Sequence, residues 1–89
     1  MSATFFLGQT VITANAQQNL HPEDVIQALH RHAAGDWGEL DEGDKQSNED
    51  ALKEGSRLLS AYTDRNNIKF WIITESDRSV TTVLLPEDY

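Results

Sequence analysis

Four side chains in the C-terminal half of the chain have the types that phosphate chemistry needs, namely Arg57, Tyr62, Lys69 and Arg78. Cations and a tyrosine hydroxyl displayed together on a sheet can stabilise the charge that develops on a phosphate during metal-independent RNA cleavage. The alternative is that these basic residues lie at strand ends, where they keep the sheet soluble and protect its edges. The set is therefore an alternative ribonuclease site.

An acidic segment runs from Asp36 to Glu54. Its eight acidic residues (36, 39, 41, 42, 44, 49, 50 and 54) and two lysines (45 and 53) give a net charge of −6, in a chain whose net charge is −8. Because phosphates bind where Lys and Arg concentrate, this balance argues against nucleic acid and anionic membranes as direct partners and favours a protein partner. A solvated helix-capping loop is the alternative. The candidate partner-binding residues are Asp36, Trp37, Glu39, Asp41, Glu42, Asp44 and Trp71.

The patterns of metal sites are incomplete. Counting from Asp36, the third and fifth residues are Gly38 and Leu40, so the loop lacks the alternating oxygen ligands of a calcium loop. His30 and His32 are two residues apart, which places them on different faces of a helix. The chain contains no cysteine. We therefore predict no metal, no cofactor and no catalytic residue outside the ribonuclease alternative.

The elements that must position these residues follow from turn and strand patterns. Strand-forming residues occupy 4–13 and 57–63, and a hairpin spans 68–86 with its turn at 76–79. A short helical turn capped by Asn15 precedes a helix over 22–34, and a second helix covers 44–54, capped by Asp41 or Asp44 and ended by Gly55. The sequence therefore predicts an α+β fold of order β-α-α-β-β-β. An antiparallel β-meander packs against two helices in a single domain, residues 1–89.

Turns at 64–67 and 76–79 would set residue 63 opposite 68 and residue 75 opposite 80. Tyr62 then falls opposite Lys69, as the ribonuclease hypothesis requires. One face carries Leu59, Ala61, Phe70, Ile72, Val83 and Leu85. The other carries Leu58, Tyr62, Trp71, Ile73, Val80 and Leu84.

Both faces of this sheet are apolar, and two helices are too few to cover both. We therefore predict that the N-terminal strand crosses the face that contains Trp71, or that this face joins two copies of the chain. The residues of that homodimer interface would be Leu58, Tyr62, Trp71, Ile73 and Leu84. No secretory signal opens the chain and no apolar run is long enough to span a bilayer, so we expect a cytoplasmic protein without a membrane partner.

Four segments resemble a family of small "plasmid-related proteins" from bacterial plasmids and integrative elements. They are 7–9, 35–40, 57–62 and 70–89. The resemblance covers nearly the whole chain and implies a bacterial, cytoplasmic accessory protein of mobile DNA. Such a protein would bind a macromolecular partner, and its acidic surface would suit an anti-restriction or anti-CRISPR protein that imitates DNA.

The element order also resembles that of RelE-type toxin ribonucleases, which implies metal-independent RNA cleavage. Those proteins are generally basic, whereas this chain is acidic. A structural homodimer without catalytic activity is the remaining alternative.

Overall fold

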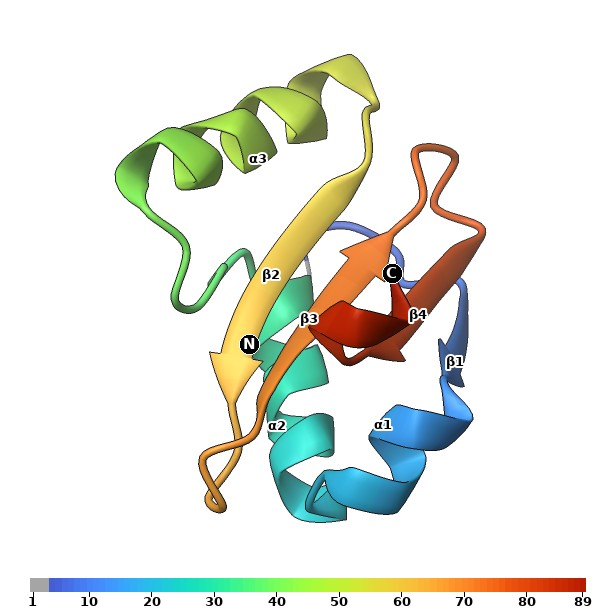
Figure 1. The fold of residues 1–89 in the computed structure, drawn as a ribbon. Coiled ribbons are helices and arrows are strands. Elements are labelled where there is room, and N and C mark those ends of the chain that lie inside the picture. Colours follow the sequence, from blue (N-terminus) through green and yellow to red (C-terminus); the bar gives the residue numbers. More distant parts are fainter. Residues whose placement is uncertain (1–3) are drawn as a thin grey trace.

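The computed structural model describes residues 4–89, which form an α+β fold (Figure 1). The predicted α+β class is confirmed, and the short helical turn expected after the first strand is a helix of six residues, so the described residues contain three α-helices where the predicted order had two. The elements in chain order are β1 (Gln9–Ile12), α1 (Ala14–Asn19), α2 (Pro22–Ala33), α3 (Glu42–Glu54), β2 (Leu58–Thr63), β3 (Lys69–Thr74), β4 (Val80–Leu84) and the 3₁₀ turn η1 (Pro86–Asp88).

The helices begin and end at the residues that local chemistry favours. Asp41 caps α3 by accepting a hydrogen bond from the backbone N–H of Asp44 at 2.8 Å, and Gly55 ends that helix in the left-handed conformation with φ 74°. Of the two predicted caps Asp41 is the one used, so α3 begins at Glu42 and not at residue 44, and the predicted end at Gly55 is confirmed. α1 is capped by Thr13, whose hydroxyl accepts from the N–H of Ala16 at 3.1 Å, so the predicted cap at Asn15 was wrong.

The sheet has the strand order β1-β4-β3-β2 (Figure 1). β2, β3 and β4 are antiparallel as predicted, but β1 pairs with β4 in parallel, so the sheet is mixed and not a pure antiparallel meander. The predicted strand over 4–13 shortens to four residues because the chain turns at Gly8, where φ is 66°. A Cβ at this position would lie 2.3 Å from the carbonyl oxygen of Ser79. β1 therefore lies along an edge of the sheet and does not cross the Trp71 face.

The register between β2 and β3 differs by one residue from the prediction. Thr63 pairs with Lys69, not with Ile68, whereas the predicted pairing of Glu75 with Val80 is confirmed by the hydrogen bond between them. In the same register Asp64 lies opposite Ile68, and its N–H donates to the Ile68 carbonyl at 3.0 Å, so the turn covers residues 65–67 and not 64–67. A slip of one residue moves every side chain of β2 to the opposite face.

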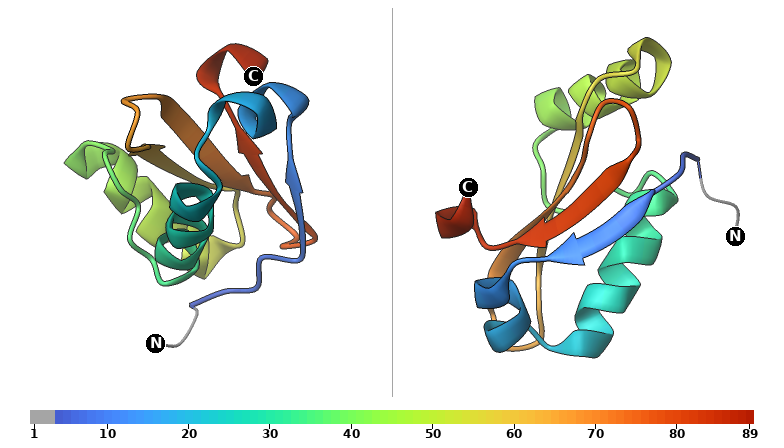
Figure 2. Two further views of the ribbon diagram at one scale, coloured as in Figure 1. Left: turned by 90° about the horizontal axis from the view of Figure 1, so that it is seen from below. Right: turned by 90° about the vertical axis from the view of Figure 1, so that its right-hand side faces the viewer.

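We call the sheet face that packs on α1 and α2 the inner face (Figure 2). It carries Leu58, Ser60, Tyr62, Phe70, Ile72, Thr74, Thr81 and Val83. The opposite, outer face carries Leu59, Ala61, Trp71, Ile73, Thr82 and Leu84, and η1 lies on this side (Figure 2). The predicted dimer face was therefore wrong as a continuous surface, because Leu58 and Tyr62 point inward. Ile73 and Leu84 are already buried within one chain.

The outer edge of β2 is closed by the chain itself. The Asn48 side chain of α3 donates to the carbonyl of Leu59 at 2.6 Å and accepts from its N–H at 3.1 Å. Two residues further along, the N–H of Ala61 donates to the carbonyl of Trp37, and its carbonyl accepts from the N–H of Glu39 at 2.8 Å. No outward backbone group of Leu59 or Ala61 is left for another strand.

Replacing Asn48 by Ala should destabilise the protein by roughly 1–3 kcal/mol, because the N–H and C=O of Leu59 lose their partner under α3. Urea unfolding monitored by circular dichroism measures the change. Ser47→Ala is the control, since that exposed neighbour bonds only within its own helix. Equal losses for the two variants would show that the β2 edge does not depend on Asn48.

Candidate functional site

The strongest charged feature is an acidic surface formed by the loop that enters α3 and by α3 itself. This surface has seven carboxylates, named at the end of this paragraph, and two lysines (45 and 53), so its net charge is −5. Within residues 4–89, none of the ion pairs involves these carboxylates: Arg31 pairs with Asp36, Arg57 with Glu75, and Arg65 with Glu23 and Asp24. The acidic surface comprises Glu39, Asp41, Glu42, Asp44, Glu49, Asp50 and Glu54.

Some of the predicted partner-binding residues have structural roles. Asp36 accepts two hydrogen bonds from Arg31, the shorter at 2.8 Å, and this guanidinium lowers the pKa of the Asp36 carboxyl. Trp37 is only 3% exposed, and its ring N–H donates to Glu49 at 2.8 Å, so it fixes the loop to the core. Trp37 is therefore inaccessible to a partner, whereas Asp36 is exposed but already paired with Arg31.

The remaining predicted residues are accessible to different degrees. Glu39 accepts from the hydroxyl of Thr63 at 2.8 Å, and Asp41 caps α3. Glu42 and Asp44 are exposed, and their side chains make no hydrogen bond or ion pair to the rest of residues 4–89. Trp71 lies on the outer face, half-buried, with its ring 5.9 Å from that of Tyr89. The structure therefore narrows the freely accessible part of the site to the exposed carboxylates of α3.

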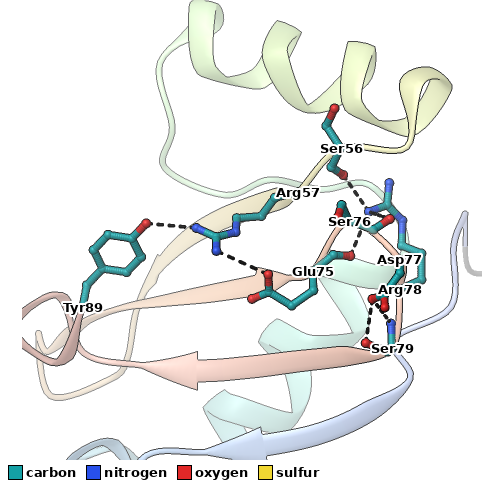
Figure 3. Close-up of polar contacts among 8 residues, drawn as sticks. All are labelled: Ser56, Arg57, Glu75, Ser76, Asp77, Arg78, Ser79 and Tyr89. Atoms are coloured by element: carbon teal, nitrogen blue, oxygen red, sulfur yellow. Dashed lines mark hydrogen bonds and ion pairs between the residues drawn. The ribbon is translucent and has the colours of Figure 1, made fainter.

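The two arginines of the ribonuclease alternative are engaged by their own chain (Figure 3). Arg57 donates to the hydroxyl of Tyr89 at 2.9 Å and to Glu75 at 3.3 Å. The guanidinium of Arg78 donates to backbone carbonyls and thereby ties the end of α3 to the β3–β4 turn. These carbonyls belong to Ala51, Ser56, Glu75 and Ser76.

Tyr62 and Lys69 lie on opposite faces of the sheet. Tyr62 pairs with Phe70 and its hydroxyl donates to the carbonyl of Asp36, whereas Lys69 pairs with Thr63 and points outward. Burial raises the pKa of Tyr62 to about 12. The prediction that Tyr62 lies opposite Lys69 was wrong, and the four residues do not converge on one position.

A buried polar network was missed by sequence reasoning. His32 is fully buried, and its ring nitrogens contact the hydroxyls of Ser60 at 2.5 Å and Thr74 at 2.9 Å. Thr74 contacts Thr81 at 2.7 Å, and Thr81 donates to the carbonyl of Leu7 at 2.6 Å. The network thus joins α2 to β2, β3, β4 and the N-terminal segment. Its signal is three hydroxyl residues at inward positions of the strands, which only the correct register reveals.

The chain of hydroxyl groups determines the tautomer of His32. Because the single hydroxyl hydrogen of Thr81 goes to Leu7, Thr74 must donate to Thr81. Thr74 then has only an acceptor left for His32, so Nε2 carries the hydrogen. Nδ1 of the neutral ring therefore accepts from Ser60. A proton added at Nδ1 would remove the acceptor of the Ser60 hydroxyl hydrogen, so the network favours the neutral imidazole.

The surroundings of His32 also favour its neutral form. Phe5 and Trp37 place their rings 5.2 and 5.7 Å from the imidazole. Burial, together with the charge of Arg78, lowers the pKa of His32 to about 4. Ser60 and His32 are both 0% exposed, so no substrate reaches this serine–histidine pair, and its role is to hold the layers together.

A hollow of about 100 Å³ is lined by residues of α2, β2 and β3, Tyr62 among them. The charged side chains that line it are already paired, Arg31 with Asp36 and Asp24 with Arg65. This space holds only a few water molecules. Among residues 4–89, no cluster of three or more metal-binding side chains is found, and no helix is long and apolar enough to cross a membrane.

Acidification should lower the free energy of unfolding because the buried His32 must take up a proton. Its folded pKa of about 4 lies below the ordinary value of 6.5, so its contribution to stability is complete above pH 6.5 and is lost as the pH falls towards 4. The full loss is about 3 kcal/mol. In His32→Gln the amide can replace both hydrogen bonds but does not titrate, so this part of the pH dependence should disappear.

Urea unfolding between neutral pH and pH 4 measures the free energy of unfolding of the wild-type protein and of His32→Gln. The carboxylates are the same in both proteins, so their contributions to the pH dependence cancel in the difference. Identical pH dependences would contradict a neutral, buried His32. Nitrogen-15 NMR of the wild-type protein at neutral pH should also place the imidazole hydrogen on Nε2.

No family model, no curated protein and no solved structure matches the chain. The membership in the plasmid-related family that the sequence suggests therefore remains a proposal. The functional argument depends on the contacts, burial and charge of the described residues.

Proposed function

We propose that the chain acts by binding a basic macromolecular partner through the acidic surface of α3 and its entering loop. The observation that carries this proposal is the absence of any ion pair to these carboxylates within residues 4–89, although Arg31, Arg57 and Arg65 all pair with acidic residues elsewhere. Glu39, Asp41 and Glu49 accept hydrogen bonds within the chain, but no cation within residues 4–89 forms an ion pair with any carboxylate of the acidic surface.

The composition of α3 supports the same conclusion. Of its thirteen residues, only Asn48 and Ala51 are buried, while Leu52 is partly buried against the core and most of the others are exposed. Like charges gathered on one surface repel one another and cost stability, whereas they accelerate association with an oppositely charged partner. A surface of this kind therefore suits a binding role better than a purely structural one.

The partner class that fits best is a protein whose own ligand is nucleic acid. A helix of 13 residues is about 20 Å long, and a DNA duplex carries about 12 phosphates over that length. Over that length α3 offers five carboxylates (42, 44, 49, 50 and 54), somewhat less than half that number, and the entering loop adds Glu39 and Asp41. The acidic surface would imitate a short stretch of duplex, which agrees with an anti-defence role on bacterial mobile DNA in the cytoplasm.

The test compares two double variants that change the net charge equally, from −8 to −6. Glu42→Gln with Glu54→Gln removes charge from the acidic surface, and Glu23→Gln with Glu87→Gln removes the same charge elsewhere. All four glutamates are exposed, and neither Glu42 nor Glu54 holds an ion pair. Partners are captured from a bacterial lysate on wild-type protein, identified and purified, and their affinities for the three proteins are measured by calorimetry.

We expect the first pair to weaken binding about tenfold or more and the second to leave it nearly unchanged. Raising the salt concentration from about 0.1 M to about 1 M shortens the Debye length from about 10 Å to about 3 Å, so binding should weaken steeply. Binding that is insensitive to salt, or equal losses for the two double variants, would contradict the role of the acidic surface.

A further inference from the structure

The two edges of the sheet differ in how their backbone groups are satisfied. The β2 edge is closed by Asn48 and the loop at 37–39. At the other edge, the N–H of Gln9 donates to the carbonyl of Ser79, just before β4, at 2.9 Å, and the N–H of Thr13 donates to Val83 of β4 at 3.0 Å. The alternate residues Thr10 and Ile12 therefore direct their N–H and C=O groups away from the sheet. Within residues 4–89, no helix or strand lies outside β1 (Figure 2).

Apart from its length of only four residues, the β1 edge also lacks the usual protection against pairing. Edge strands are commonly protected by charged residues, proline or a bulge. All four residues of β1 are exposed, none is charged or proline, and Val11 and Ile12 are each 37% exposed. The first twenty residues of the chain contain no Asp, Glu, Lys, Arg or His, although the whole chain has a net charge of −8.

We propose that β1 is the dimerisation edge and that its partner is a second copy of this chain. Antiparallel pairing about a twofold axis through Val11 would set Thr10 opposite Ile12 of the other copy, in both directions. Each of these pairs exchanges two N–H···O bonds, so four backbone hydrogen bonds form. Val11 meets its counterpart on the outer face, and the two sheets join into one of eight strands.

The charge distribution selects a second copy as the occupant. Two chains that each carry −8 repel each other on most approaches, and β1 brings no charged side chain of its own to a contact. The carboxylate of Asp88 lies beside the end of β1, where it accepts from Thr13 at 2.7 Å and from Asn15 at 3.1 Å. The acidic surface lies beside β2, at the opposite edge of the sheet from β1. The dimer would therefore present one acidic surface at each end. Formation of the dimer does not depend on which partner the acidic surface binds.

The dimer should be weak and dependent on concentration, because four hydrogen bonds and a pair of valines form an interface at the small end of the range for proteins. Salt should strengthen it by screening the repulsion between the two acidic chains. This dependence has the opposite sign to that of the proposed partner binding, so failure of one proposal is distinguishable from failure of the other.

Sedimentation equilibrium tests the proposal directly. The mass of the wild-type protein should rise with concentration from 10.0 kDa towards twice that value. Val11→Lys sets two like charges opposite each other and should weaken the dimer about tenfold or more. Ile26→Lys makes the same change of charge at a position that is 55% exposed on α2 and should leave the dimer intact.

A mixture of the Val11→Lys and Val11→Glu proteins should form a one-to-one heterodimer, which neither protein can imitate alone. Thr10→Pro gives a second test, because it removes an outward N–H without removing a bond to β4. Circular dichroism confirms that each variant is folded. A wild-type protein that stays monomeric up to about 1 mM, or a dimer that survives both Val11→Lys and Thr10→Pro, would overturn the proposal.

Discussion

The arrangement of this small sheet depends on the carboxylate of Asp64. The residue is only 4% exposed, and its oxygens accept hydrogen bonds from the backbone N–H groups of His21, Asn66 and Ile68 at 2.9–3.0 Å. Burial raises the pKa of the Asp64 carboxyl, but the three N–H donors together lower it by more. The pKa of Asp64 is therefore below its ordinary value. One charged group thus shapes the β2–β3 turn and ties the start of α2 to it.

This turn determines which side chains face the core. With Thr63 opposite Lys69, β2 directs Leu58, Ser60 and Tyr62 inward. Ser60 then reaches the imidazole of His32, while Tyr62 lies under α2 with the guanidinium of Arg31 4.8 Å from the centre of its ring. The polar network and the closed β2 edge are both consequences of the same register.

Much of the fold follows from the sequence because its signals are local. Pro22 and the acidic residues after it start α2, while Asp41 and Gly55 bound α3 as expected. The register could not be found in the same way, because the carboxylate of Asp64 shapes the turn through contacts with residues 21 and 68. The parallel pairing of β1 with β4 also joins segments about seventy residues apart, which no local pattern encodes.

The candidate site shows the same limit. The acidic character of residues 36–54 is visible in the composition, but the burial of Trp37 and the pairing of Asp36 with Arg31 are products of tertiary packing. What remains accessible is a charged surface at the β2 side and an uncharged strand at the β1 side. We infer that the two edges of the sheet have separate tasks, one towards a basic partner and the other towards a second copy.

The most direct measurement of the central constraint is the pattern of Hα–Hα nuclear Overhauser effects between β2 and β3. With the register set at Asp64, close pairs should be observed between Ala61 and Trp71 and between Thr63 and Lys69. Contacts between the Hα atoms of Tyr62 and Lys69 would instead place these two side chains on one face. That result would contradict the account of both the core and the functional surfaces.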